Sequence, residues 1–180
     1  VKKSRSFQNG ALTYMEVAQR VLSGYGQSGV TDHATGGACI PEFLLQYEES
    51  DWVFLRRLAS HFGTYLLADA TDACGKVYFG IPEISYGTVL DRQDYTMEKD
   101  MLHYARVLEK EGVLSQEASC WNVMVRFFLR MGETLTFNGI EAVVTAMRLH
   151  TEKGELVYSY VLARRAGIRR EKEKNPGIFG

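Results

Sequence analysis

The sequence has few of the features that mark membrane, secreted, metal-binding and nucleotide-binding proteins. No apolar run approaches the roughly 20 residues that a membrane-spanning helix needs. The cysteines are Cys39, Cys74 and Cys120, an odd number without a Cys-x-x-Cys pair, which favours reduced thiols over a disulfide framework and disfavours structural zinc. Neither a P-loop nor a Gly-x-Gly-x-x-Gly motif is present, so the sequence does not support nucleotide binding.

Charge of neither sign is in excess. The chain has 21 Lys and Arg residues against 22 Asp and Glu residues, which gives a formal net charge of -1. This balance gives no reason to expect contact with nucleic acid or a stable association with a membrane. With 180 residues, 46% of them hydrophobic, the chain suits one large domain or two small ones with a packed core.

The first residues do not form a secretory signal, because Val1–Arg5 is charged and no apolar stretch follows it. The chain also begins without Met. We therefore expect a cytosol-made protein that is either processed or a segment of a longer one.

Residues 13–25 are expected to form the first helix. Thr13 and Glu16 have the spacing of a capping box, in which each side chain accepts a hydrogen bond from the backbone amide of the other residue. Apolar residues then recur at helical spacing. They are Tyr14, Val17, Ala18, Val21, Leu22 and Tyr25. The small and polar residues of 27–38 indicate a loop with one short strand near Val30.

The segment 43–67 encodes a strand, a capped helix and a second strand with short connections. Ser50 or Asp51 offers a side-chain oxygen to the free amides at the start of the helix, and Gly63 ends it. The helical spacing predicts a buried side with Trp52, Leu55, Leu58, Ala59 and Phe62, and a solvent side with Arg56, Arg57 and Ser60. Strands are expected at 43–47, 64–67 and 76–81.

Beyond Pro82 the sequence becomes rich in β-branched and aromatic residues with frequent turn signals, which indicates antiparallel β structure. The alternation in 101–108 favours a strand, although 109–112 also permits a short helix. Asn138 and Gly139, between alternating apolar runs, predict a type I′ hairpin. Further strands are expected at 118–128, 134–137, 140–149 and 156–163. Because a meander with one buried face needs closure or a second layer, we expect a small barrel.

Three acidic residues stand near the start of the second helix. Two of the three residues Glu48, Glu49 and Asp51 are candidates for the pair of carboxylates in sugar hydrolysis, which needs one protonated and one ionised acid. A structural reading is favoured, because the free amides and the dipole of a helix stabilise acidic side chains at its start.

Histidine and cysteine give no recognisable site. His33, His61, His103 and His150 are isolated and have no metal-ligand spacing. A nucleophilic pair of Cys39 or Cys120 with one of these histidines can be written, but distance in sequence says nothing of distance in the fold. Cys120 follows the apolar pattern next to Trp121 and is expected to be a buried, inert thiol. No catalytic, cofactor-binding or metal-binding residue is therefore predicted.

The middle of the chain resembles a known family. The residues concerned are Gln46, Tyr47, Glu49, Ser50, Asp51, Phe54, Leu55, Arg57, Leu58, Gly63 and Tyr65. In this register they resemble the hub proteins of contractile injection machines, namely the baseplate hub or late control protein D of phage tails and the VgrG spike proteins of type VI secretion. Residues 6–8 and 137–139 extend the resemblance more weakly toward both ends.

The expected elements give an α+β fold, with a helix-and-sheet unit holding two amphipathic helices (1–84) and a small antiparallel β-barrel (85–166), as in phage baseplate hub proteins. The resemblance implies that 167–180 is a linker toward the spike. It implies a structural, non-enzymatic subunit of a homotrimer that joins the tail tube to the spike and contacts other baseplate proteins, without a cofactor. Such a subunit is made in the bacterial cytoplasm and assembled into a virion or tail-like particle. The alternative is a cell-wall-acting hydrolase or a carbohydrate-binding module.

Overall fold

The computed structural model of the chain describes residues 1–26, 29–41, 43–69, 71, 75–91 and 94–170. These residues divide into two units, the first containing Val1–Ile81 and Arg170 and the second containing Pro82–Arg169. Both units combine sheets with helical segments, so the fold class is α+β, as the sequence predicts.

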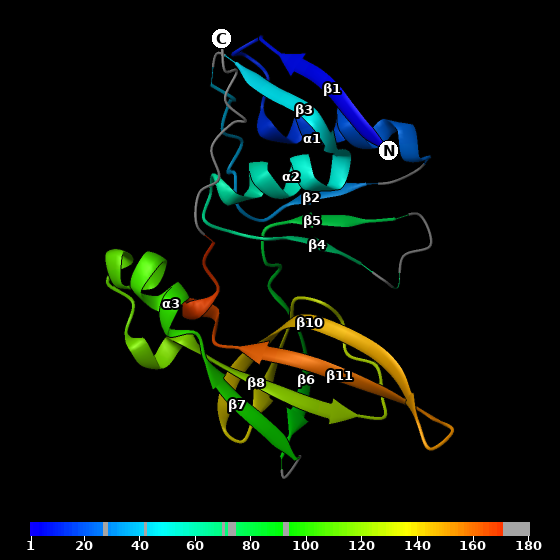
Figure 1. The fold of residues 1–180 in the computed structure, drawn as a ribbon, viewed down its shortest axis with the longest axis vertical. Helices are drawn as coiled ribbons and strands as arrows, with labels where there is room; N and C mark the ends of the chain where they lie inside the picture. The colour runs from blue at the N-terminus through cyan, green and yellow to red at the C-terminus, as the bar shows by residue number, and fades with distance from the viewer. Residues whose placement is uncertain (27–28, 42, 70, 72–74, 92–93, 171–180) are drawn as a thin grey trace. The chain divides into compact units, whose positions relative to one another are not determined.

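The first unit places two helices between two small sheets (Figure 1). One sheet pairs β1 with β3 in antiparallel fashion, and the other has the order β2-β5-β4, with β2 parallel to β5. The elements are β1 (Lys2–Phe7), α1 (Tyr14–Leu22), η1 (Ser23–Tyr25), β2 (Val30–Asp32), β3 (Leu44–Ser50), α2 (Asp51–Ser60), β4 (Leu66–Ala68) and β5 (Val77–Phe79).

Helix α1 begins at the predicted capping box. The Glu16 backbone amide donates to Thr13 Oγ1 at 3.2 Å, and the Thr13 amide donates to Glu16 Oε2 at 2.7 Å. The expected apolar side is buried from Tyr14 to Leu22. Tyr25 differs, since it lies beyond α1 in the short η1 turn with 54% of its surface exposed.

Helix α2 also begins and ends where the sequence predicts. Ser50 Oγ accepts a hydrogen bond from the Val53 amide at 3.3 Å, and Gly63 adopts a φ of 63° after the last turn. The prediction that Trp52 is buried is wrong, because it lies in the first turn and is 39% exposed. The prediction that Arg57 and Ser60 face solvent is also wrong, since both are buried. A helix between two sheets is covered on more than one side, so a single apolar stripe does not describe its burial.

The apolar core of the first unit joins both helices to both sheets. Its fully buried side chains include Val17, Leu44, Phe54, Leu55, Leu58 and Phe79. Phe7 of β1 stacks on Phe54 of α2 with ring centroids 5.8 Å apart. Burying each such side chain contributes about 1.5–3 kcal/mol, so this core is the main stabilising feature of the unit.

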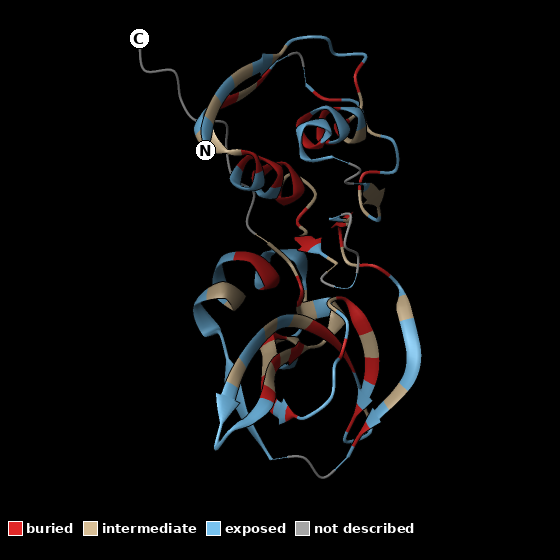
Figure 2. Ribbon diagram, turned by 90° about the vertical axis from the view of Figure 1, so that its right-hand side faces the viewer, coloured by how far each residue is buried: buried red, intermediate tan, exposed pale blue. Residues whose placement is uncertain are grey.

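The second unit contains one six-stranded sheet in the order β6-β9-β10-β11-β8-β7, which curls around a buried core (Figure 2). The strands are β6 (Ile84–Leu90), β7 (Tyr95–Lys99), β8 (Ser119–Val125), β9 (Glu133–Phe137), β10 (Ile140–Glu152) and β11 (Glu155–Ala163). The helical segments are α3 (Met101–His103), η2 (Tyr104–Leu108), η3 (Glu109–Glu111), η4 (Ser115–Ala118) and η5 (Arg165–Gly167).

The expected closed, all-antiparallel barrel is not formed. Among the described residues no ladder joins β6 to β7, and β6 runs parallel to β9. Instead of backbone pairing, side chains cover the core near the β7 edge, where the Tyr95 ring meets the Phe137 ring edge-on with centroids 5.2 Å apart. The sheet is therefore curled but open.

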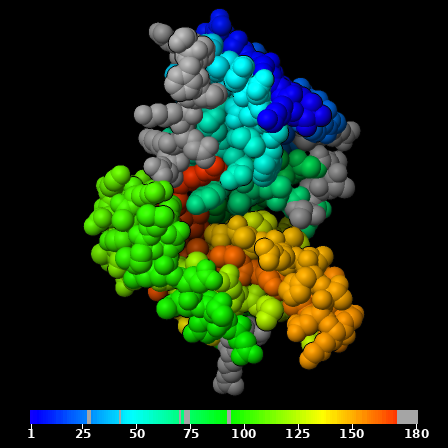
Figure 3. Space-filling view, viewed as in Figure 1, coloured from blue at the N-terminus to red at the C-terminus, as the bar shows by residue number. Residues whose placement is uncertain are grey.

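The predicted strand at 101–108 is wrong, because Met101–Glu111 is helical throughout. Asp100 caps this segment, with its Oδ1 accepting from the His103 amide at 2.8 Å, and Gly112 ends it at a φ of 72°. Val107 and Leu108 are buried on its inner side. The segments from α3 to η4 form the green lobe at the side of the unit (Figure 3). The local cap and this burial outweigh the alternating pattern.

The predicted hairpin at Asn138 and Gly139 is confirmed. Asn138 and Gly139 adopt φ values of 46° and 77° between β9 and β10, which are the two positive values that a type I′ turn requires. Lys153 and Gly154 repeat the arrangement between β10 and β11, with φ values of 49° and 84°.

The expected C-terminal linker is described only as far as Arg170. In this part η5 ends next to Ile168, which is 6% exposed, and the Arg170 amide donates to Gly63 O at 2.9 Å. The remainder of the expected linker lies outside the described residues.

Candidate functional site

The most elaborate polar site of the first unit surrounds Asp51, whose side chain is 3% exposed. Asp51 Oδ2 accepts from Lys3 Nζ at 2.6 Å and from the Tyr25 hydroxyl at 2.8 Å. Asp51 Oδ1 accepts from Gln46 Nε2 at 2.9 Å and from the Arg5 guanidinium. Four donors from three other elements therefore converge on one buried carboxylate.

The backbone explains how these donors meet. Lys3 and Arg5 alternate along β1, and opposite them β3 has a bulge between Gln46 and Glu49. Within this bulge Glu48 adopts a φ of 46°, and its amide donates to Ser4 Oγ at 3.2 Å. Such bulges redirect the side chains beside them. Here Gln46 accepts from Arg5 Nε at 2.9 Å while it donates to Asp51.

The contacts of Asp51 determine its charge. Burial on its own would raise the pKa of this carboxyl, because it disfavours the charged form. The hydrogen bonds from Lys3, Gln46, Tyr25 and Arg5 outweigh burial and hold the pKa of Asp51 well below its usual range. An acid in this state remains ionised at neutral pH and has no proton to donate.

The two neighbouring acids lie in different surroundings. Glu49 Oε1 accepts from Arg57 Nη2 at 2.5 Å, and the same nitrogen donates to Leu45 O at 2.6 Å. Glu48 is exposed. The structure therefore places Glu49 and Asp51 in separate ion pairs, and it explains why Arg57 is buried on α2.

The predicted candidate histidines are dispersed. His61 Nδ1 lies 3.0 Å from the Tyr14 hydroxyl, and the His33 ring lies against the Tyr78 ring at 5.7 Å. His103 lies in α3 and His150 in β10. Among the described residues, no group of three or more His, Cys, Asp or Glu side chains could hold a metal ion.

The described cysteines have local contacts. Cys39 is exposed, and its Sγ lies 3.9 Å from Ala11 O. The Cys120 Sγ lies 3.6 Å from Glu98 O, and burial raises the pKa of this thiol. Cys74 lies outside the described residues.

Sequence reasoning did not find Lys3, Arg5 or Tyr25 as partners of Asp51. The alternation of basic residues in β1 was the available signal, since Lys3 and Arg5 share one side of a strand. No local pattern predicts that this side meets an acid 46 or more residues away.

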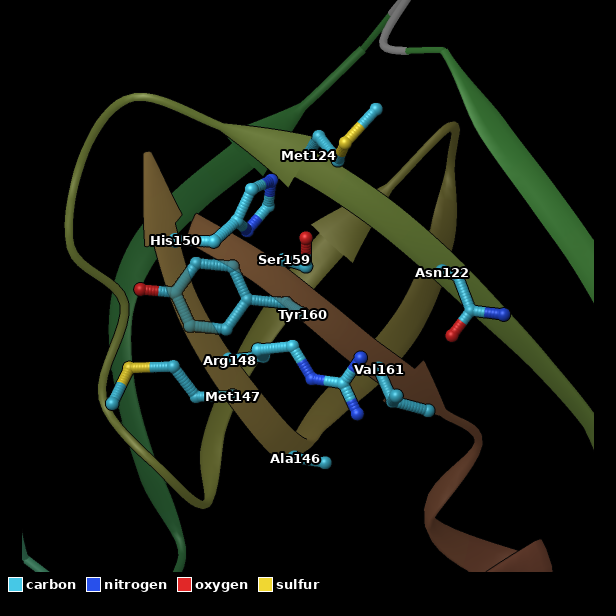
Figure 4. Close-up of a pocket in the computed structure, with 9 residues that line it drawn as sticks. All are labelled: Asn122, Met124, Ala146, Met147, Arg148, His150, Ser159, Tyr160 and Val161. Atoms are coloured by element: carbon cyan, nitrogen blue, oxygen red, sulfur yellow. The ribbon is translucent and has the colours of Figure 1, made fainter. Parts of the chain in front are cut away.

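A second site, also missed, is a groove of about 600 Å³ on the sheet of the second unit (Figure 4). Its lining comes from β8, β10 and β11. The residues are Asn122, Met124, Ala146, Met147, Arg148, His150, Ser159, Tyr160 and Val161. The groove combines apolar side chains with a guanidinium, an imidazole, an amide and a hydroxyl.

In the described part of the chain, no helix has the length and apolar character needed to cross a membrane.

Comparisons with known proteins add information on the fold. No protein-family model matches the chain, and no curated protein matches it in sequence. Among solved structures, the chain is similar over its whole length to the E. coli c3393 protein, with a TM-score of 0.72 and 14% identity. That protein is a type VI secretion component described as structurally similar to the T4 bacteriophage tail proteins gp27 and gp5.

Two tail proteins are similar as well. The prophage MuSo2 43 kDa tail protein from Shewanella oneidensis has a TM-score of 0.65 and 10% identity, and the match covers 92% of this chain and 67% of that one. The tail protein from Neisseria meningitidis MC58 has a TM-score of 0.61 and 12% identity, and the match covers 93% of this chain and 71% of that one.

The chain has a phage-tail-protein fold. This phage-tail fold agrees with the broad resemblance that residues 46–65 show. The chain spans 56% of the length of the c3393 structure.

Proposed function

We propose that the chain is a structural subunit of a contractile injection apparatus, a baseplate hub of a phage tail or a VgrG-like spike hub, and that it joins the tail tube to the spike. The supporting observation is the fold that the whole chain shares with a type VI secretion component and, over most of its length, with two tail proteins. The central motif around Gln46 and Asp51 supports the finer assignment to hubs.

In this proposal the helix-and-sheet unit (predicted as 1–84) and the curled sheet (predicted as 85–166) act as separate domains, and 167–180 leads toward the spike. Three copies form a ring that contacts the tube, the spike and other baseplate proteins. The subunit is made in the bacterial cytoplasm and assembled into the particle. Its role needs no reaction, nucleic acid or stable contact with a membrane.

The Asp51 network suits such a mechanical role. It connects β1, η1, β3 and the start of α2 through side chains that are distant in sequence. Loss of the Asp51 carboxylate would also leave the buried Gln46 amide without one of its acceptors, which is unfavourable. The network therefore resists separation of β1 from α2 when force is applied to the subunit.

The hydrolase alternative receives less support from the geometry. A retaining or inverting glycosidase needs a protonated acid beside an ionised one. Asp51 is buried, holds a strongly lowered pKa, and has each oxygen occupied by two donors. These features favour a structural carboxylate.

Immunogold electron microscopy tests the proposal. An epitope tag is inserted in the exposed turn at Lys153 and Gly154, in the gene of the bacterium that encodes the chain, and contractile particles are purified. We expect gold at the end of the tail where tube and spike meet. The proposal would be contradicted if the tagged protein accumulates in the cell but is absent from the purified particles.

An activity assay tests the non-enzymatic part. We expect no release of fragments when the purified chain is incubated with peptidoglycan. Release that the Asp51→Asn variant abolishes would favour the hydrolase.

A further inference from the structure

Three polar side chains on the outer face of β10 and β11 have no partner among the residues that the structure describes. Arg148 and Ser159 lie directly opposite each other in the ladder, and His150 follows Arg148 by two residues on the same face. None of the three forms a hydrogen bond or ion pair within the described part of the chain. His150 Nδ1 is shielded from solvent and has no hydrogen-bond partner there. Arg148 is exposed and Ser159 is half-buried, so both side chains can still bind a ligand.

The charge of the groove defines what would complete it. Arg148 is the one formally charged side chain among its nine lining residues, and none of them is acidic. Asp94 lines an adjoining hollow on the β7 side, which shares Asn122, Met124 and Ser159 with the groove. Positive charge is thus confined to the β10 side. A guanidinium and a hydroxyl side by side are suited to a carboxylate, which accepts charge-assisted hydrogen bonds.

The ladder also defines a shape. Arg148, Ser159 and Met124 form one cross-strand row, and Ala146, Val161 and Asn122 form the next row on the same face. Such rows are about 7 Å apart, because each residue of a strand advances about 3.3 Å and the side chains alternate. An extended peptide repeats its side chains at the same spacing. An acidic residue over the first row therefore places the residue two positions away over the small apolar floor of Ala146 and Val161.

We propose that this groove binds an extended segment of a partner protein with an acidic residue and a small apolar residue two positions apart. The carboxylate accepts from the Arg148 guanidinium and from the Ser159 hydroxyl. The apolar residue packs on Val161 and Ala146. The existence of a protein partner rests on the proposed assembly role, and the groove names the chemistry of that partner.

Titrations of the ¹⁵N-labelled chain test the site. The probes are the tripeptide acetyl-Glu-Ser-Val-amide and its matched control acetyl-Gln-Ser-Val-amide, which has the same shape without the charge. We expect saturable shift changes at 122–124, 146–150 and 159–161 with the Glu peptide, and about tenfold weaker binding of the Gln peptide, because an ionic hydrogen-bonded contact is lost.

Variants assign the contact. Arg148→Gln is expected to weaken binding of the Glu peptide about tenfold and to leave the affinity for the Gln peptide unchanged. Arg126→Gln is the matched control, because Arg126 pairs with Glu155 at 2.9 Å and does not line the groove. We expect it to bind both peptides as the unchanged protein does. Spectra without peptide verify that each variant is folded.

Three results would overturn the proposal. The first is equal affinity for the two peptides. The second is the absence of shift changes up to about 10 mM peptide, a concentration at which only very weak binding would be missed. The third is unchanged binding of the Glu peptide by folded Arg148→Gln. Shift changes at the groove that grow with protein concentration alone would identify a second copy as its occupant and also overturn it. Failure of the tail-labelling experiment leaves the peptide result standing, so the two proposals fail separately.

Discussion

Arginine is used in opposite ways in the two units. In the first unit Arg5 and Arg57 lie against acids, with side chains 29% and 5% exposed, and their contacts connect strands to a helix. In the second unit Arg148 is exposed on an open sheet face and contacts no acid among the described residues. An arginine that is paired with an acid inside the fold stabilises the fold, whereas the exposed and unpaired Arg148 is the basis of the proposed binding site.

The strongest way to break this contrast is Asp51→Ala. The change removes the buried acceptor of Lys3 and Arg5, whose side chains stay 38% and 29% exposed, and one acceptor of the buried Gln46 amide, so we expect a loss of about 3 kcal/mol in the free energy of unfolding. Urea denaturation followed by circular dichroism measures it. The matched control is Glu155→Ala, which breaks the exposed Arg126–Glu155 pair at a cost below about 1 kcal/mol. Equal losses for both variants would remove the distinction between buried and exposed pairs.

The Leu58→Ala variant measures how much the apolar core contributes to stability, for comparison with the ion network around Asp51. Leu58 is fully buried on α2, and truncating such a side chain costs about 2–5 kcal/mol. The same denaturation measurement applies, with Val53→Ala as the control, because Val53 lies on the same helix with 45% of its surface exposed. A loss below about 1 kcal/mol for Leu58→Ala would contradict its place in the core.

Acidic pH is expected to lower the stability of the first unit, because Asp51 becomes protonated. Its pKa is lower in the folded protein than in the unfolded chain, so the stabilisation is complete above the unfolded value of about 3.9 and is lost as pH falls toward the folded value. We expect the difference in unfolding free energy between the unchanged protein and Asp51→Asn to narrow as pH falls below about 4. Denaturation curves at successive pH values measure it. A difference that stays constant across these pH values would show that the charge of Asp51 contributes nothing to stability.

The smallest expected effect concerns the hairpin that aligns β9 with β10. Gly139 has a φ of 77° with open space around it, so Gly139→Ala costs about 1 kcal/mol through backbone strain alone. Gly10→Ala is the control, because Gly10 also lies in open space and needs no positive φ. Thermal unfolding of both variants measures the difference. Equal midpoints would contradict the strained turn.

Local chemistry made much of this architecture predictable. The Thr13 capping box, the Ser50 cap and the Asn138–Gly139 turn each use atoms within about four residues, and all three occur as expected. The fold class follows from these elements. The α3 segment was the exception, since an alternating pattern that suited a strand was overridden by the Asp100 cap and the burial of Leu108.

The candidate sites were less predictable. Asp51 was identified as a structural acid at a helix start, but the donors that hold it were not. Lys3 and Arg5 come from a strand that is 46 or more residues away, and only the pairing of β1 with β3 brings them to α2. The groove next to Arg148 likewise depends on three strands in register, which no single stretch of sequence specifies.

The caps, the turns, the two helices of the first unit and most strands can be predicted from the amino-acid sequence, because these features depend on neighbours along the chain. The burial of Arg57, the absence of a ladder between β6 and β7 in the described part of the chain, and the four donors around Asp51 depend on the packing of the folded chain. Burial and ion pairing depend on which distant segments pack together, and that information is distributed over the whole chain.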